Sequence, residues 1–180
     1  MVNEILLGDC YKLIKKIPDK SIDLIYTDIP YSFNSGGSCD KSRISQNVNK
    51  LMKELNGITD GIDFTILDDF VRVMKKINCF IWCSKDQILY LLNYFTFRGC
   101  MFEILTWNKS NPTPMTNNTY LPDIEYCLYF RESGVALNNG YFLKSKWYIS
   151  SKNVTDKKYF NHPTIKPLEL VKRHILHTTQ

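Results

Sequence analysis

The 180-residue sequence has no apolar run of transmembrane length and no Cys-x-x-Cys pair. A membrane-spanning helix needs roughly 20 consecutive apolar residues, so the first absence argues against one. The opening stretch MVNEILLGD also lacks the basic segment and the long apolar stretch of a signal peptide. The six cysteines are scattered, mostly within apolar runs. We therefore expect a cytoplasmic protein that keeps buried free thiols in a reducing compartment and has no membrane partner.

Patterns of metal ligands are equally scarce. Cys79 and Cys83 fall within one expected strand, NCFIWC, and their spacing points both side chains to the same face. A zinc site there would need two more ligands, which the neighbouring sequence does not offer. His174 and His177 lie about one helical turn apart, again without an evident third ligand. No metal site is expected.

The charge balance favours one class of partner without establishing it. The sequence has 23 basic and 18 acidic residues, a formal charge of +5. This excess suits a polyanion, although many proteins without such a partner carry as much.

Short apolar runs alternate with helical periodicity along the whole chain, a pattern typical of an open α/β sheet. No repeat or interdomain linker interrupts it, so we expect one domain over residues 1–180. The predicted strands are Glu4–Leu7, Asp23–Thr27, Cys79–Cys83, Met101–Trp107 and Ile124–Phe130, the last two paired antiparallel. The predicted helices are Cys10–Ile17, Phe64–Met74, Asp86–Phe95 and a final helix that begins at Pro167. A polar segment over residues 32–61, with a possible short helix at Leu51–Leu55, is a loop or lid.

The tetrad Asp28-Ile29-Pro30-Tyr31 directly follows a predicted strand. Ligands of open α/β sheets bind beyond the carboxyl ends of the strands, so the tetrad is a candidate site. Asp28 and the Ile29 carbonyl can accept the two hydrogens of an exocyclic amine, Tyr31 can stack on the ring, and Pro30 stiffens the turn. Two acceptors pull the amine nitrogen toward tetrahedral geometry and free its lone pair to attack an electrophilic methyl group. A base inside a duplex would have to be flipped out to reach them.

At these residues the sequence resembles the S-adenosylmethionine-dependent DNA methyltransferases that methylate amino groups. It is most similar to the permuted class in which the catalytic tetrad precedes the cofactor loop, notably the phage and prophage adenine methylases. The resemblance runs nearly end to end, through GDCYKLIKKIPDKSIDLIYTDIPY, FIWCSKDQ, LTWNKSNPTP, LPDIEYCLYF and HPTIKPLELVKRHI. It implies a Rossmann-like methyltransferase sheet with a C-terminal antiparallel hairpin. It also implies methyl transfer to the 6-amino group of adenine in DNA, in a phage, prophage or restriction–modification setting inside a bacterial cell.

The resemblance assigns further roles by position. Asp28 to Tyr31 would form the catalytic turn, and an Asp at the first position tilts the target toward adenine, because cytosine-directed relatives more often carry Ser there. The expected cofactor-binding residues are Asp9 beside the adenosine, and His162, Thr164, Lys166 and Pro167 of the HPTxKP signature near the methionine end, where Lys166 can meet a carboxylate. The expected nucleic-acid contacts are Trp107, Asn108, Lys109 and Asn111 beside the target pocket, and Lys144 and Lys146 in a lysine-bearing segment with interleaved aromatics. The lysines of this segment fit an ordinary solvated surface equally well; they are Lys144, Lys146, Lys152, Lys157 and Lys158.

Three features depart from the family pattern. Ile29 stands where the usual tetrad has a second proline, and it can keep the carbonyl contribution with a less stiff turn. We expect the segment over residues 131–161 to recognise the target, and because it is short for that task we expect residues 32–61 to share it. No FxGxG stretch occurs. We therefore expect an incomplete sheet without its central strands, in which the strand Glu4–Leu7 has no neighbour. The chain alone should then bind S-adenosylmethionine weakly and be inactive, unless another chain supplies the missing half. An open sheet edge could also pair two copies as a homodimer.

Other functions stay open at this point. A catalytically dead DNA-binding or interaction module would keep the same surface without cofactor chemistry. A cytosine-4-amino or RNA-directed methyltransferase would use the same tetrad. A protein-directed enzyme is disfavoured, because glutamine-directed relatives favour Asn where this chain has Asp28.

Overall fold

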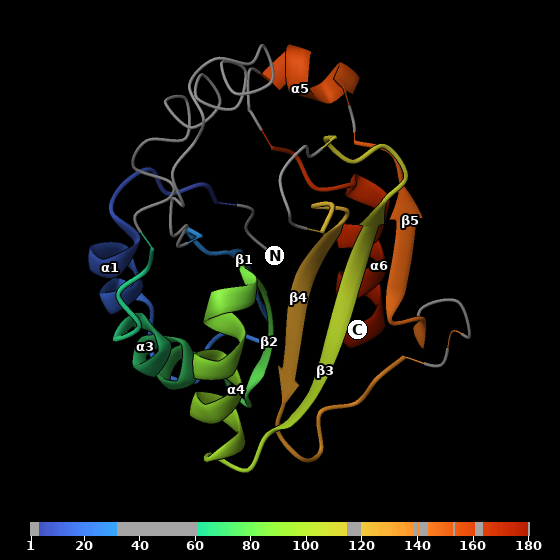
Figure 1. Cartoon of the computed structure of the whole chain (residues 1–180). Helices are drawn as coiled ribbons and strands as arrows, with labels where there is room; N and C mark the ends of the chain where they lie inside the picture. Colours follow the sequence, from blue (N-terminus) through green and yellow to red (C-terminus); the bar gives the residue numbers. More distant parts are fainter. Residues whose placement is uncertain are drawn as a thin grey trace.

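The computed structural model describes residues 4–31, 61–114, 120–138, 140, 144–152, 154–160 and 164–179. Its five strands form one mixed sheet in the order β1-β2-β4-β3-β5 (Figure 1). They are Ile25–Asp28 (β1), Asn78–Cys83 (β2), Met101–Lys109 (β3), Ile124–Arg131 (β4) and Trp147–Ser150 (β5). β1 is parallel to β2 and β5 is parallel to β3, whereas β4 is antiparallel to both β2 and β3. The predicted α/β sheet and its β3–β4 hairpin are confirmed.

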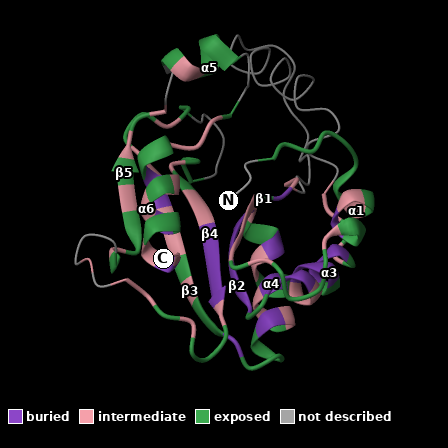
Figure 2. Ribbon diagram, turned by 180° about the vertical axis from the view of Figure 1, so that it is seen from behind, coloured by how far each residue is buried: buried purple, intermediate pink, exposed green. Residues whose placement is uncertain are grey.

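Helices cover both faces of this sheet. They are α1 (Cys10–Leu13) with the 3-10 turn η1 (Ile14–Lys16), α3 (Ile66–Val73), the 3-10 turn η2 (Lys85–Gln87) with α4 (Ile88–Thr96), α5 (Val154–Phe160) and α6 (Leu168–Thr178). α3 and α4 pack on one face and α6 on the other (Figures 1 and 2). The predicted helices are confirmed with shifted ends, and Pro167 is the N-cap of α6. Within the described ranges, none of the helices has both the length and the apolar character needed to cross a bilayer.

The inner strand β2 separates two apolar cores. All six of its residues are buried, as Figure 2 shows. Cys79, Ile81 and Cys83 face the core under α3 and α4, so the predicted shared face of the two cysteines is confirmed. Phe80 and Trp82 face the opposite core, which includes Leu170 of α6. Cys10, Cys79, Cys83, Cys100 and Cys127 are free thiols, and among the described residues no three His, Cys, Asp or Glu side chains are grouped as metal ligands.

Two strand predictions need correction. Residues 4–7 do not form a strand, and Ile5 and Leu7 are fully exposed. A strand needs a neighbour for its backbone hydrogen bonds, and none of the described strands pairs with this segment. The strand predicted at Asp23–Thr27 is present as β1, but it is only half-buried, because it lies at the edge of the described sheet.

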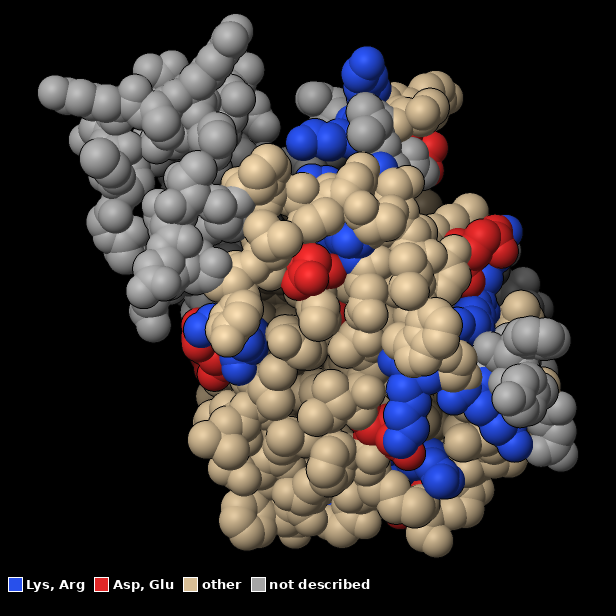
Figure 3. All heavy atoms as spheres, turned by 45° about the vertical axis from the view of Figure 1, so that its right-hand side comes forward, with Lys and Arg blue, Asp and Glu red and all other residues tan. Residues whose placement is uncertain are grey.

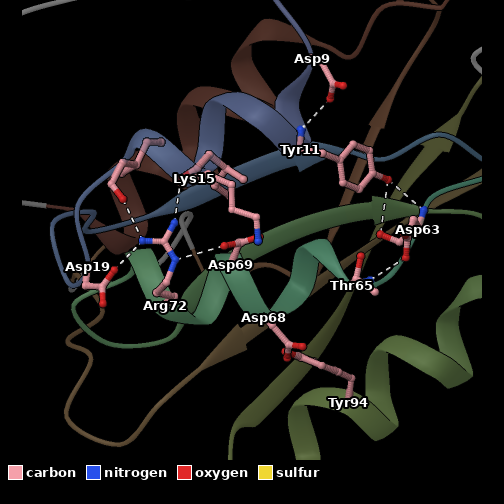
Figure 4. Close-up of polar contacts among 12 residues, drawn as sticks. Asp9, Tyr11, Lys15, Asp19, Asp63, Thr65, Asp68, Asp69, Arg72 and Tyr94 are labelled. Atoms are coloured by element: carbon pink, nitrogen blue, oxygen red, sulfur yellow. Dashed lines mark hydrogen bonds and ion pairs between the residues drawn. The ribbon is translucent and has the colours of Figure 1, made fainter.

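The segment before β1 is attached to α3 through Arg72 (Figure 4). The Arg72 guanidinium donates to the carbonyl oxygens of Ile14 at 2.8 Å and Ile17 at 2.9 Å. It also pairs with the carboxylates of Asp19 at 2.5 Å and Asp69 at 3.1 Å. This one side chain therefore joins η1 and the loop after it to the helix layer.

Candidate active site

The tetrad forms a turn at the carboxyl end of β1. Asp28 is the last residue of the strand, and its side chain is 45% exposed. The Ile29 backbone N–H donates to the Trp82 carbonyl oxygen at 3.2 Å. The Gln87 side-chain amide donates to the Pro30 carbonyl oxygen at 2.9 Å. The turn is thus fixed by β2 and by η2, while its carboxylate faces the surface.

Ile29 explains how the turn tolerates the departure from the family tetrad. Its side chain is only 3% exposed and packs in the core under α3 and α4. Burial of an isoleucine side chain stabilises a fold by about 1.5–3 kcal/mol. The side chain therefore anchors the turn by packing, where a proline would restrict it through its ring.

Lys166 closes the site from the segment before α6. Its ammonium lies 2.7 Å from Asp28 Oδ2, 3.2 Å from Tyr31 Oη and 2.9 Å from Glu125 Oε2. Lys166 thus meets two carboxylates of the protein itself, and its contact with the methionine end of the cofactor stays a prediction. Burial lowers the pKa of Lys166, but the charges of Glu125 and Asp28 outweigh burial and raise the pKa above its ordinary value. The lysine therefore stays charged beside the catalytic turn.

Glu125 is a site residue that our sequence analysis did not identify. It lies on β4 opposite Trp107, and its second oxygen, Oε1, is 2.7 Å from Lys109 Nζ. Burial raises the pKa of Glu125, but the neighbouring charges of Lys166 and Lys109 outweigh it and leave the pKa lowered. The available signal was one carboxylate within the otherwise apolar strand IEYCLYF.

Tyr31 is a neutral neighbour of these charges. Burial, followed by the negative charges of Asp28 and Glu125, raises its pKa well above the usual range of a tyrosine. Its ring centroid lies 5.4 Å from the Lys166 ammonium. The hydroxyl therefore remains protonated in the site.

The predicted cofactor residues come from separate parts of the fold. Asp9 is the N-cap of α1, where its carboxylate accepts from the Tyr11 backbone N–H at 2.9 Å (Figure 4). Thr164, Lys166 and Pro167 lie in the segment that leads into α6. His162 and most of the predicted lid, residues 32–60, lie outside the described residues.

The segment after β3 meets the loop after β5. Asn111 Oδ1 accepts from the Lys152 backbone N–H at 2.7 Å. Partial burial, followed by the charges of Lys109 and Lys157, lowers the pKa of Lys152. The three lysines form a basic cluster (Lys109, Lys152 and Lys157) at the sheet edge that also carries Asp28. Basic side chains are visible at the top of the molecule, where α5 lies (Figure 3).

Three predicted nucleic-acid residues are placed elsewhere. Trp107 is buried, and its indole N–H donates to Ser150 Oγ at 2.9 Å, so its ring belongs to the core. Lys146 precedes β5 and pairs with Glu103. Lys144 contributes, after burial, to the lowered pKa of His177 and so lies near the end of α6. The structure does not bring Lys144 and Lys146 to the edge that carries Asp28.

Comparisons with known proteins agree with this architecture. The family described as DNA methylase matches residues 22–180. The Type II methyltransferase M2.MboI of Moraxella bovis is 29% identical over 195 residues, which cover 96% of this chain and 70% of that protein. Two solved structures share the fold. The M1.HpyAVI–SAM complex has a TM-score of 0.62 and 18% identity, covering 96% of this chain and 75% of its own. The PvuII DNA methyltransferase, cytosine-N4-specific, has a TM-score of 0.65 and 13% identity, covering 97% and 69%.

Proposed function

Because the chain belongs to the DNA methylase family, as its match over residues 22–180 shows, we propose that it transfers a methyl group from S-adenosylmethionine to the 6-amino group of adenine in DNA. The observation that carries the proposal is the exposed Asp28 carboxylate, held beside Tyr31 and Lys166 at the carboxyl end of β1. The Type II methyltransferase M2.MboI supports a restriction–modification role.

The turn offers the contacts that an exocyclic amine needs. Asp28 would accept one amine hydrogen and the Ile29 carbonyl the other, which makes the nitrogen pyramidal and frees its lone pair. S-adenosylmethionine would supply an electrophilic methyl group on a sulfonium sulfur. As the amine nitrogen took up that methyl group, Asp28 would accept the released amine proton, and its exposed carboxylate could pass the proton to water.

The residues at the amino end of the chain fit the adenosine of the cofactor. Ile5 and Leu7 present exposed apolar surface, and Asp9, which follows them in the sequence, has a partly exposed carboxylate. Apolar side chains suit a purine ring, and a carboxylate suits ribose hydroxyls or the adenine amino group. Asp9 would hold the adenosine, and His162, Thr164 and Pro167 the methionine end. Lys166 already has two carboxylate partners, so we assign it to the catalytic turn first.

The basic cluster is the proposed contact with the DNA backbone. Burial, followed by the charges of Lys109 and Lys157, lowers the pKa of Lys152, and a phosphate beside Lys152 would relieve that repulsion. Asn108 and Asn111 lie on the same edge and would border the flipped base. Lys144 and Lys146 lie before β5, away from the edge that carries Asp28. They would therefore contact only DNA that extends from that edge past β5.

We prefer adenine as the target because cytosine-directed relatives more often carry Ser where this chain has Asp28. Adenine and cytosine both present an exocyclic amine beside a ring nitrogen, so the chemistry of the turn serves either base. The fold is shared with a cytosine-N4-specific enzyme. N4-cytosine is therefore the alternative target.

The test measures tritiated methyl transfer from S-adenosylmethionine to mixed-sequence DNA, followed by mass spectrometry of the nucleosides. The chain is assayed alone and together with the part of M2.MboI that it does not match. We expect N6-methyladenine in at least one arm and its loss in Asp28→Ala. The matched control is Asp23→Ala, which removes an exposed aspartate two residues before β1.

Each outcome decides between the functions. N4-methylcytosine would replace the adenine assignment. Labelling of RNA but not DNA would move the substrate class. No incorporation in either arm, from protein whose circular dichroism shows it folded, would overturn the proposal in favour of a DNA-binding module.

A further inference from the structure

Glu125 contacts both lysines of the site. One carboxylate oxygen lies 2.9 Å from Lys166 Nζ and the other 2.7 Å from Lys109 Nζ. We propose that Glu125 is a positioning residue that shares Lys166 with Asp28, so that Asp28 can release the lysine and accept the target amine. The inference rests on the proposed function and extends it to a residue of β4.

Burial makes Glu125 the more permanent partner of the lysine. The side chains of Lys166, Glu125 and Lys109 are 13%, 16% and 15% exposed, whereas that of Asp28 is 45% exposed. A buried ammonium is stable only while it keeps an ionic partner. Lys166 therefore needs Glu125 when it leaves Asp28, and Lys109 balances the charge of Glu125 meanwhile.

The lysine and the substrate compete for one oxygen. Lys166 donates to Asp28 Oδ2 at 2.7 Å, and an adenine amine would donate to the same carboxylate. Without the charge of Glu125, Asp28 is the one carboxylate left beside Lys166 among the described residues. The lysine would then stay on the catalytic oxygen and oppose entry of the amine.

The first measurement follows the charge of Lys166 and needs no activity. The charged and titratable groups that face this ammonium are Asp28, Tyr31, Glu125 and Cys127, with Lys109 behind Glu125. Burial raises the pKa of the Cys127 thiol and of Tyr31 well above their usual values, so neither should ionise below pH 10. Titration in that range therefore reports the lysine.

We would record NMR spectra of protein labelled at the lysine side chains from pH 7 to pH 10, assigning Lys166 by its absence in Lys166→Met. In the unchanged chain Lys166 should stay charged throughout, because Glu125 and Asp28 raise its pKa. In Glu125→Gln the larger of these two favourable charges is lost while Asp28 remains, so the pKa of Lys166 should be lower than in the unchanged chain. Glu132→Gln, at the far end of β4, should behave like the unchanged chain.

The second measurement separates kcat from KM in the methyl-transfer assay. Binding of DNA depends mainly on backbone contacts, whereas displacement of Lys166 follows binding. Glu125→Gln should therefore lower kcat by about tenfold or more, the effect of losing one site interaction worth roughly 1.4 kcal/mol, with little change in KM. Glu132→Gln should retain kcat.

The inference fails if the titration of Lys166 in Glu125→Gln is the same as in the unchanged chain, or if kcat is unchanged in an active enzyme. If the unchanged chain is inactive in both arms, the proposed function fails, and the NMR titration still decides whether Glu125 controls Lys166. If Glu125→Gln does not fold, the double variant Glu125→Gln/Lys109→Met removes one charge of each sign and takes its place.

Discussion

Replacing Ile29 with the proline that the family tetrad usually carries should destabilise this protein. The Ile29 backbone N–H donates to the Trp82 carbonyl oxygen at 3.2 Å, and proline has no such donor. The isoleucine side chain is also buried in the core under α3 and α4, where a proline ring fills a different space. The proline that is usual in the family therefore does not suit the surroundings of residue 29 in this chain.

The size of the effect follows from three contributions. The lost hydrogen bond is worth about 0.5–1.5 kcal/mol. The altered packing costs about 0.5–1.5 kcal/mol, as in the removal of a buried methylene. A stiffer unfolded chain returns about 0.4–1 kcal/mol. Taking the middle of each range, the free energy of unfolding should fall by about 1.3 kcal/mol, which for a chain of this length lowers Tm by about 3–5 °C.

Thermal unfolding followed by circular dichroism measures this shift directly. Ile29→Val keeps the N–H and reports the packing contribution by itself. An unchanged or higher Tm in Ile29→Pro would refute the argument, because it would mean that ring stiffness outweighs the contacts of Ile29.

Two further predictions concern pH and salt. Burial, followed by the charges of Arg173 and His177, lowers the pKa of His174 to about 3. The unfolded chain binds this proton below about pH 6.5, so stability is complete above that pH and falls toward pH 3, by up to about 1.4 kcal/mol per pH unit. Urea unfolding at pH 7 and pH 5 should show a smaller loss in His174→Phe than in the unchanged chain, and an equal loss would exclude His174 as the cause. For DNA binding, Lys152→Gln and Lys157→Gln should each reduce the slope of log K against log salt by about 0.9, measured by fluorescence anisotropy. Lys75→Gln makes the same charge change next to Asp23 and should leave the slope unaltered.

The sequence predicted those parts of the fold whose periodicity reflects burial. The strands that became β2, β3 and β4 and the helices α3, α4 and α6 all have one apolar side or a fully apolar run. The segment Glu4–Leu7 has the same apolar character, but it forms no strand because pairing depends on a neighbour that composition does not reveal. β5 and α5 were not predicted, because β5 is only four residues long without a buried residue, and the described side chains of α5 are mostly exposed.

The site was predictable only where chemistry coincides with a motif. Asp28, Tyr31 and Lys166 belong to recognisable motifs, and the structure brings them together. Glu125 could not be placed with them, because its contacts arise from the register between β3 and β4. For the same reason the sequence could not separate Lys144 and Lys146, before β5, from Lys152, after it.

The attachment of the amino-terminal segment through Arg72 has a consequence for sequence divergence. A paired strand is held by backbone groups that every residue supplies, so its side chains can vary without loss of the connection. Here one guanidinium binds two backbone carbonyls and two carboxylates, beside the Lys15–Asp69 ion pair and backbone hydrogen bonds from residues 20–22 to the end of α3. Since Arg72 binds the backbone oxygens of Ile14 and Ile17, those two side chains could change without loss of its contacts. The loss of Arg72 would instead leave Asp19 without this partner and Asp69 with Lys15.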